Sequence, residues 1–384
     1  MELSEIAAGL IDRGVRQIHS FAWRDLDDPE AGGSEVHADH VFKLWAESGM
    51  EILHRTSTAD HHREFERNGY RVIQHAGRYG VFPSAVAHEI RSGAKSRDAV
   101  LEIWNGVPWF SQMWARVPTN VWLHHVHGPM WHQSLPLGIA HAGRLLESRI
   151  APLFYRRTPI VTLANSGREE LLHLGFKPDK VHVVNPGVDA AFCVDESVSR
   201  TVNPSMVAVG RLAPVKRFNV LIDTVVRLQK RIPNLTLTIV GDGPDREALR
   251  TQIAANDAAS FITLAGRLDH GDLIDLYRRT WLLTGTSLAE GWGMTITEAG
   301  ACGTPSVVID NAGHRDATVN GVTGIVSPTF DRFEEDLFGA LTDQPLRARL
   351  SAGAVDRSHV LRWHNTAAST LGHLLDEVVR RQSK

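Results

Sequence analysis

The feature that most constrains this chain is an alternation of short apolar segments with longer segments of helical periodicity. In the first half, the apolar segments are typical of β-strands, and helical patterns fall between them, around 34–48, 84–91, 137–156 and 168–174. The expected strands are 17–23, 51–55, 71–74, 99–103, 120–124, 159–163 and 181–184. Strands that alternate with helices predict a parallel sheet with helices on both faces.

A polar, irregular stretch near 190–204 interrupts this alternation, which then starts again. Further strands are expected at 205–209, 235–240, 261–264, 281–284 and 306–309. The 384 residues therefore predict an α/β chain with two doubly wound, Rossmann-like domains, 1–190 and 204–362, and a final helix in 363–384. Ligands of such sheets bind beyond the carboxyl ends of the strands, so we expect the domains to face each other across a cleft that holds the ligands.

Composition narrows the functional classes. The net charge of −3 gives no reason to expect nucleic-acid binding. Two cysteines, Cys193 and Cys302, are too few for a secreted disulfide scaffold, so a reducing cytoplasm is expected. The N-terminus lacks the pattern of a signal peptide, and no apolar stretch approaches the roughly 20 residues that cross a bilayer. Any membrane association would be peripheral, at the inner face.

The segment 289–299, with the sequence AEGWGMTITEA, carries the strongest functional signal. It follows a predicted strand and begins a helix. Gly291 and Gly293 allow a ligand to approach the backbone, and the first amides of the helix, near Met294 and Thr295, favour an anion such as a diphosphate. Glu290 and Glu298 provide hydrogen-bond acceptors at two depths. The alternative is that acidic residues only complement the dipole of this helix.

With seven residues between its two glutamates, this segment resembles the retaining glycosyltransferases of family 4, and the resemblance extends along most of the chain, from Gly32-Gly33 to Gly324. It implies the GT-B fold and a nucleotide-diphosphate sugar as donor. It also implies that Glu290 contacts the donor sugar and that Glu298 holds the ribose.

Further donor-binding residues follow from other strand ends. Arg211 and Lys216 are cations that can bind a diphosphate and stabilise it as it leaves, although solvated surface charge is the simpler interpretation. The resemblance places them at the donor phosphates and places Arg267 and Leu268 beside the base. At Asp316 this chain has a shorter acid than the glutamate of many relatives.

The first domain offers candidates on the acceptor side. Gly32 and Gly33 form either an anion-binding loop or a tight turn with Ser34 as the helix cap. The resemblance implies that this loop faces both the donor phosphates and the acceptor, so Gly32 and Gly33 are also donor-binding candidates. His124, His125 and His127 follow a strand; His124 fits the family's histidine near the reacting sugar best, the other two remain rivals, and a zinc site is the alternative.

The resemblance implies transfer of a sugar from a UDP- or GDP-sugar to a hydroxyl acceptor, which is a glycan, a glycolipid or a small molecule, with retention of configuration. The catalytic candidates are Glu290, His124, Arg211 and Lys216. No obligatory metal or other cofactor is expected. The competing classes are a GT-B epimerase or phosphorylase, a sugar-nucleotide sensor and a nicotinamide oxidoreductase. The last of these lacks its glycine fingerprint after the first strand.

Overall fold

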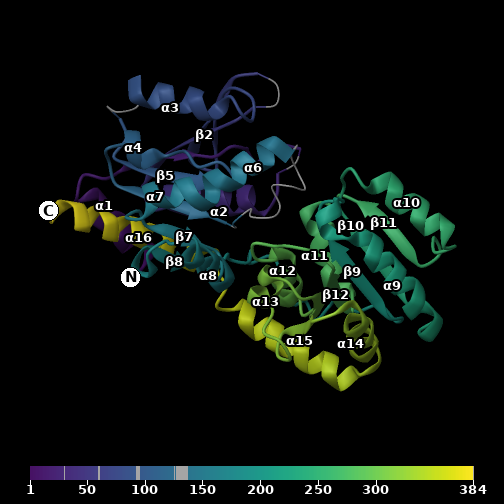
Figure 1. The fold of residues 1–384 in the computed structure, drawn as a ribbon. Helices are drawn as coiled ribbons and strands as arrows, with labels where there is room; N and C mark the ends of the chain where they lie inside the picture. Colours follow the sequence, from purple (N-terminus) through teal and green to yellow (C-terminus); the bar gives the residue numbers. More distant parts are fainter. Residues whose placement is uncertain (30, 59–60, 92–95, 125, 127–136, 384) are drawn as a thin grey trace. The chain divides into compact units, whose positions relative to one another are not determined.

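The computed structural model describes residues 1–384 except 30, 59–60, 92–95, 125, 127–136 and 384. The chain forms two compact units (Figure 1). The first comprises residues 1–187 and 363–384, and the second comprises residues 188–362.

The first unit is built on an eight-stranded sheet in the order β3-β4-β2-β1-β5-β6-β7-β8. Every pairing is parallel except that of β3 with β4, which is antiparallel. The strand order reverses between β1 and β5, so their carboxyl ends form a topological switch point. The strands are β1 (Gln17–Phe21), β2 (Glu51–Thr56), β3 (Arg63–Arg67), β4 (Tyr70–Gln74), β5 (Ala99–Trp104), β6 (Thr119–Leu123), β7 (Ile160–Thr162) and β8 (Val181–Val183).

Two helical segments of this unit differ from the sequence prediction. The predicted helix 137–156 is divided by a π-helical turn, Leu146–Ile150, and the N-terminal segment forms a helix, α1 (Leu3–Ile11), with an apolar face that is buried. The final helix, α16, packs against α1, α2 and β6, and both chain ends lie there (Figure 1). The remaining helices are α2 (Gly33–Glu47), α3 (Val81–Arg91), α4 (Ser111–Trp114), α6 (Leu137–Leu145), α7 (Ala151–Tyr155), α8 (Asn165–His173) and α16 (Trp363–Gln382).

The second unit has a six-stranded sheet, in which all the pairings are parallel. Its order, β11-β10-β9-β12-β13-β14, is that of a Rossmann fold and reverses between β9 and β12. The strands are β9 (Ser205–Val209), β10 (Thr236–Val240), β11 (Ile262–Gly266), β12 (Leu282–Gly285), β13 (Ser306–Ile309) and β14 (Gly324–Ser327). The helices are α9 (Phe218–Arg231), α10 (Arg246–Ala255), α11 (His270–Arg279), α12 (Met294–Ala301), α13 (Ala312–Ala317), α14 (Phe330–Thr342) and α15 (Gln344–Ser358).

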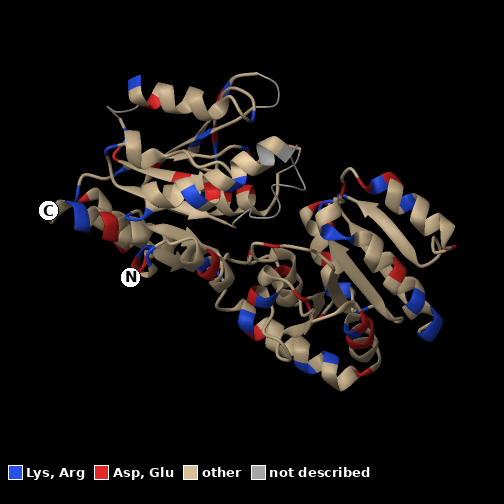
Figure 2. Cartoon of the chain, in the orientation of Figure 1, with Lys and Arg blue, Asp and Glu red and all other residues tan. Residues whose placement is uncertain are grey.

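The core of the second unit shows why its helices form where they do. Leu221, Val225 and Leu228 recur at helical spacing along α9 and are fully buried against the apolar residues of the sheet. Lys and Arg as well as Asp and Glu occur along the helices of both units (Figure 2). Across the described ranges, no helix is both long and apolar enough to cross a membrane.

Candidate active site

Two loops of the second unit leave neighbouring strands at the switch point. β9 and β12 pair in parallel, with Val207 opposite Leu283, so the loops that follow them lie side by side. The first loop runs through a 3-10 turn, Pro214–Lys216, to α9, and the second runs to α12. The Thr286 hydroxyl donates to the backbone oxygen of Lys216 at 2.9 Å, and Arg217 Nε donates to the Thr286 oxygen at 2.9 Å, which ties the loops together.

Lys216 and Glu290 form an ion pair across these loops. Both side chains are half-buried, and the Ser287 hydroxyl donates to the same Glu290 oxygen at 2.7 Å. Burial alone would raise the pKa of Glu290, but the charge of Lys216 and these hydrogen bonds hold it below its ordinary value. Two residues that the sequence assigned to different parts of a donor are therefore direct partners. An incoming diphosphate would compete with Glu290 for Lys216.

His314 is a further residue of this site that sequence reasoning did not single out. It is buried on α13 and lines the same small pocket as Lys216 and Glu290. Its Nδ1 lies 2.7 Å from the Ile309 oxygen and 2.9 Å from Asn311 Nδ2. Burial lowers its pKa, so the ring is neutral at pH 7. The neighbouring Gly313 allows α13 to pack directly against the backbone of Glu290. A Cβ at this position would lie only 2.4 Å from the Glu290 backbone oxygen.

Gly293 is the N-cap of α12, and its φ of 112° is unfavourable for other residues. Its first amides, at Met294 and Thr295, have no acceptor within the helix, which suits an anion. Glu298 lies one turn further along and is half-buried, and burial raises the pKa of its carboxyl to about 7. The two glutamates thus lie in different electrostatic environments, with Glu290 ionised and Glu298 titrating near neutrality.

The other predicted donor residues lie at the same edge of the sheet. Arg211 is exposed at the end of β9, and Gly291 lies in the loop before α12. Arg267 and Leu268 follow β11, two strands away from β9. Gly241, which follows β10, has a packing role, because a Cβ there would lie 2.0 Å from the Gly210 oxygen.

The glycine loop of the first unit lies at the switch point between β1 and β5. Gly32 is the N-cap of α2, and Gly33 is its first residue. The Gly32 amide donates to Glu35 Oε2 at 2.8 Å, so the structure assigns the capping interaction to Glu35 rather than to Ser34. Arg24 holds Glu35 through two hydrogen bonds of 3.1 and 3.3 Å.

His124 is buried at the end of β6, where its Nε2 lies 3.3 Å from Nδ1 of His37 on α2. The His37 ring also packs edge-on against Trp122 and Trp363. Burial holds the pKa of His37 well below its ordinary value, so this histidine is neutral. His37 is a neighbour that the sequence pattern did not reveal. The rivals His125 and His127 lie outside the described residues.

Comparison with known proteins agrees with this geometry. Residues 195–357 match the family described as Glycosyl transferases group 1. The chain carries a glycosyltransferase group 1 domain.

Two relatives are D-inositol 3-phosphate glycosyltransferases. The chain is 34% identical to the one from Stackebrandtia nassauensis over 58% of its own length and 55% of the relative. It is 26% identical to that from Jonesia denitrificans over 92% of its own length and 93% of the relative. In the first alignment, the chain thus spans about half the length of the relative it matches.

Solved structures show the fold. The sucrose-phosphate synthase from Thermosynechococcus elongatus superposes with a TM-score of 0.78 at 16% identity, covering 96% of this chain and 99% of that one. The Anabaena protein HepE in complex with UDP and glucose gives 0.71 at 16% identity, again covering 96% and 99%. WaaG, a glycosyltransferase of lipopolysaccharide biosynthesis, gives 0.72 at 17% identity, covering 92% and 98%. The protein has the GT-B fold.

Proposed function

We propose that this protein is a retaining glycosyltransferase that transfers a sugar from a UDP- or GDP-sugar to a hydroxyl acceptor. The observation that carries the proposal is the Lys216–Glu290 pair at the switch point of a glycosyltransferase group 1 domain. A cation beside the first amides of a helix is suited to a diphosphate, and an ionised carboxylate beside it is suited to sugar hydroxyls.

In the proposed reaction, the bond between the anomeric carbon and the diphosphate oxygen breaks, and a bond from that carbon to the acceptor oxygen forms on the same face. The acceptor's proton passes to the departing diphosphate. Lys216 and Arg211 stabilise the negative charge on the diphosphate, Glu290 orients the sugar, and Glu298 holds the ribose. His124 and the Gly32-Gly33 loop are proposed to act beside the reacting sugar.

The donor can be identified by a thermal-shift panel of UDP, GDP, ADP and their sugars, because a ligand that prefers the folded state raises the melting temperature. The selected nucleotide sugar is then incubated with acceptors, D-inositol 3-phosphate among them because relatives carry that name. A new glycoside with retained configuration and one free nucleoside diphosphate supports the proposal. An epimerised sugar nucleotide, or no turnover with any acceptor, counts against it. We also propose that no metal is required, so activity should survive EDTA.

We further propose that the protein works in the cytoplasm and associates peripherally with the membrane. Leu145, Ile150, Leu153 and Phe154 are exposed along the segment from α6 to α7, among four arginines. Exposed apolar side chains with basic neighbours suit an anionic lipid surface. Sedimentation with anionic, but not neutral, vesicles would support this, and a Leu153→Glu/Phe154→Glu variant should then stay in solution. Equal recovery of the wild type with both kinds of vesicle would contradict it.

A further inference from the structure

The loop that joins β1 to α2 carries an unusual density of negative charge. Asp25, Asp27 and Asp28 precede the glycines that begin α2. Carboxylates so close together repel one another, and they would also repel a diphosphate brought to the amides of this helix. If a diphosphate binds at the start of α2, the charges of these aspartates must be neutralised and their side chains held away from it.

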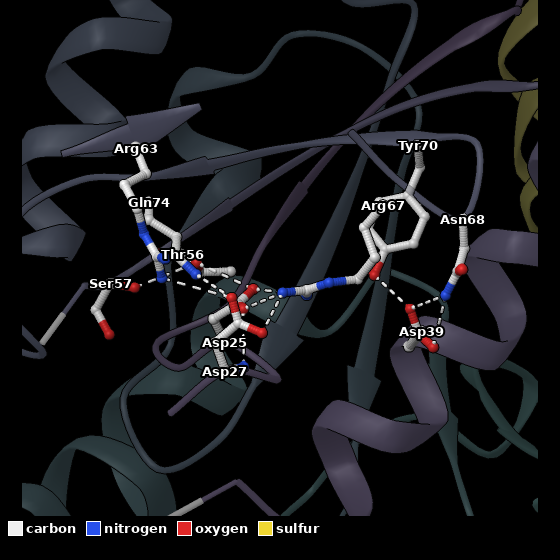
Figure 3. A network of polar contacts seen from close by, with 10 residues as sticks. All are labelled: Asp25, Asp27, Asp39, Thr56, Ser57, Arg63, Arg67, Asn68, Tyr70 and Gln74. Carbon is white, nitrogen blue, oxygen red and sulfur yellow. Dashed lines mark hydrogen bonds and ion pairs between the residues drawn. The ribbon is translucent and has the colours of Figure 1, made fainter. Parts of the chain in front are cut away.

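Arg67, at the end of β3, neutralises two of these acids (Figure 3). Its Nη1 and Nη2 donate to the two carboxylate oxygens of Asp25 at 3.2 and 2.8 Å, and Nη2 also lies 2.8 Å from Asp27 Oδ1. The Asp25 side chain is 2% exposed and that of Arg67 is 12% exposed, so this forked interaction is shielded from water. Arg67 therefore joins the two aspartates into one rigid group.

The hairpin that carries Arg67 also holds the helix on the far side of the glycines. The turn at Asn68 and Gly69 has positive φ angles of 48° and 84°, as in a tight two-residue hairpin. From the other side of this turn, Tyr70 Oη donates to Asp39 of α2 at 2.7 Å, and Asn68 Nδ2 donates to the same carboxylate at 3.0 Å. Figure 3 shows Asp25 and Asp27 on one side of the Arg67 side chain and the contacts with Asp39 on the other. The hairpin thus bonds to the aspartates before Gly32-Gly33 through Arg67, and to Asp39 after these glycines through Asn68 and Tyr70.

We propose that Arg67 is a positioning residue for glycosyl transfer: by binding Asp25 and Asp27 it fixes the part of the loop that carries these aspartates, and with it the first amides of α2, for the donor diphosphate. The inference rests on the proposed function. It assigns a role to the antiparallel hairpin, which departs from the otherwise parallel sheet.

A simpler role is that Arg67 serves only as a counter-ion for a buried carboxylate. Arg67→Met alone does not separate the two roles, because it leaves Asp25 buried and unpaired and so destabilises the fold. Arg67→Met/Asp25→Asn removes both charges together, so no buried charge is left unpaired and stability should be largely restored. The loop then lacks its Arg67 contacts but keeps the Arg78–Asp28 pair at 2.8 Å. Arg63→Met is the matched control: Arg63 lies on the same strand, bonds mainly to Gln74 at 2.8 and 3.1 Å, and lies 3.5 Å from Asp27.

The full-length variants are compared by amide hydrogen exchange, by UDP affinity and by release of UDP from UDP-glucose, with the GDP compounds replacing these if the panel selects them. For the double variant we expect near-wild-type melting, and exchange in residues 22–36 faster by about tenfold. UDP affinity should be lower, because the amides proposed to meet the diphosphate are no longer fixed, and turnover should be slower by about tenfold or more, since small misplacements of positioning groups have large kinetic effects. Arg63→Met should behave as wild type.

Wild-type exchange and wild-type turnover in the double variant would overturn the inference and leave only the counter-ion role. If the double variant does not fold, Arg67→Lys replaces it, because Lys keeps a positive charge beside Asp25 but cannot bind two carboxylates through a planar fork. Faster exchange and slower turnover are again expected, and wild-type values overturn the inference. If the wild type itself releases no nucleotide from any sugar nucleotide, the proposed function fails. The exchange measurement still decides whether Arg67 holds the loop.

Discussion

Nucleotide binding should depend on pH through Glu298. Burial raises the pKa of this carboxyl to about 7 in the ligand-free protein. A carboxylate accepts hydrogen bonds from ribose hydroxyls more strongly than a neutral carboxyl does. Binding should therefore remove a proton from Glu298, so that affinity rises with pH up to about 7 and then levels off.

The magnitude follows from the pKa. A carboxyl with a pKa of about 7 is about one tenth ionised at pH 6 and about nine tenths ionised at pH 8. If only the ionised form binds ribose, the dissociation constant should fall about tenfold over this range, which is about 1.4 kcal/mol. Glu298→Gln keeps the shape of the side chain, cannot ionise, and should remove this pH dependence.

The ionisation of Glu298 also affects stability, and here the protonated form is the favourable one. Because its pKa in the folded chain lies above the ordinary 4.5, the folded chain binds this proton more tightly than the unfolded chain. The free energy of unfolding should thus fall as pH rises from 4.5 to 7, by at most about 3 kcal/mol. Without ligand at pH 8, Glu298→Gln should therefore resist urea better than the wild type while binding nucleotide more weakly.

The predicted pH dependence of nucleotide affinity can be checked by titration calorimetry with UDP at pH 6, 7 and 8, on the wild type and on Glu298→Gln. The terminal phosphate of UDP itself titrates near pH 6 or so, and the Gln variant shares that contribution, so the ratio of the two affinities isolates Glu298. Parallel pH profiles for the two proteins would refute the reasoning, as would equal affinity at pH 8.

Three further predictions concern the same unit and its motion. Arg211→Ala and Lys216→Ala should each slow turnover, on the order of a hundredfold, by removing charge that stabilises the leaving diphosphate; folded variants with wild-type rates would contradict the donor site. Gly241→Ala should destabilise the second unit by about 2 kcal/mol or more, because its Cβ would lie 2.0 Å from the Gly210 oxygen, and an unchanged urea midpoint would disprove this. Fluorescent labels, one in each unit, should approach each other at saturating nucleotide if the units close as such domains commonly do; a constant distance would indicate a rigid arrangement.

Much of the fold could be predicted because the apolar residues of its helices and strands recur at regular local spacing. The strand at 205–209 has the predicted bounds, and the helix predicted at 34–48 lies within one residue of the observed α2 at each end, since each buries a regular set of apolar residues. The hairpin strand β3 could not be predicted in this way. Its sequence, REFER, has one apolar residue, and it is a strand because it pairs with β4. The helix α1 was missed although Leu3, Ile6 and Leu10 recur at helical spacing. The structure adds that this apolar face packs against α16 from the other end of the chain.

The residues of the candidate site could likewise be predicted in part, whereas their pairing could not. Glu290, Glu298 and Lys216 are found from sequence because they lie in or beside short motifs whose local geometry, a strand end followed by a turn and a helix, brings them to one edge of a sheet. Only the tertiary structure shows that Lys216 and Glu290 are partners, 74 positions apart.

Other partnerships are equally invisible to local pattern. His37 meets His124 across 87 positions, and Arg67 meets Asp25 across 42. Such pairs carry no periodic signal, because they depend on which strands become neighbours in the sheet. The sequence alone therefore determined the type of each unit and the location of the donor motif. The folded chain decided which charges neutralise one another and which carboxyl remains free to titrate, because burial and distance, the two quantities that set a charge's energy, exist only after the strands have paired.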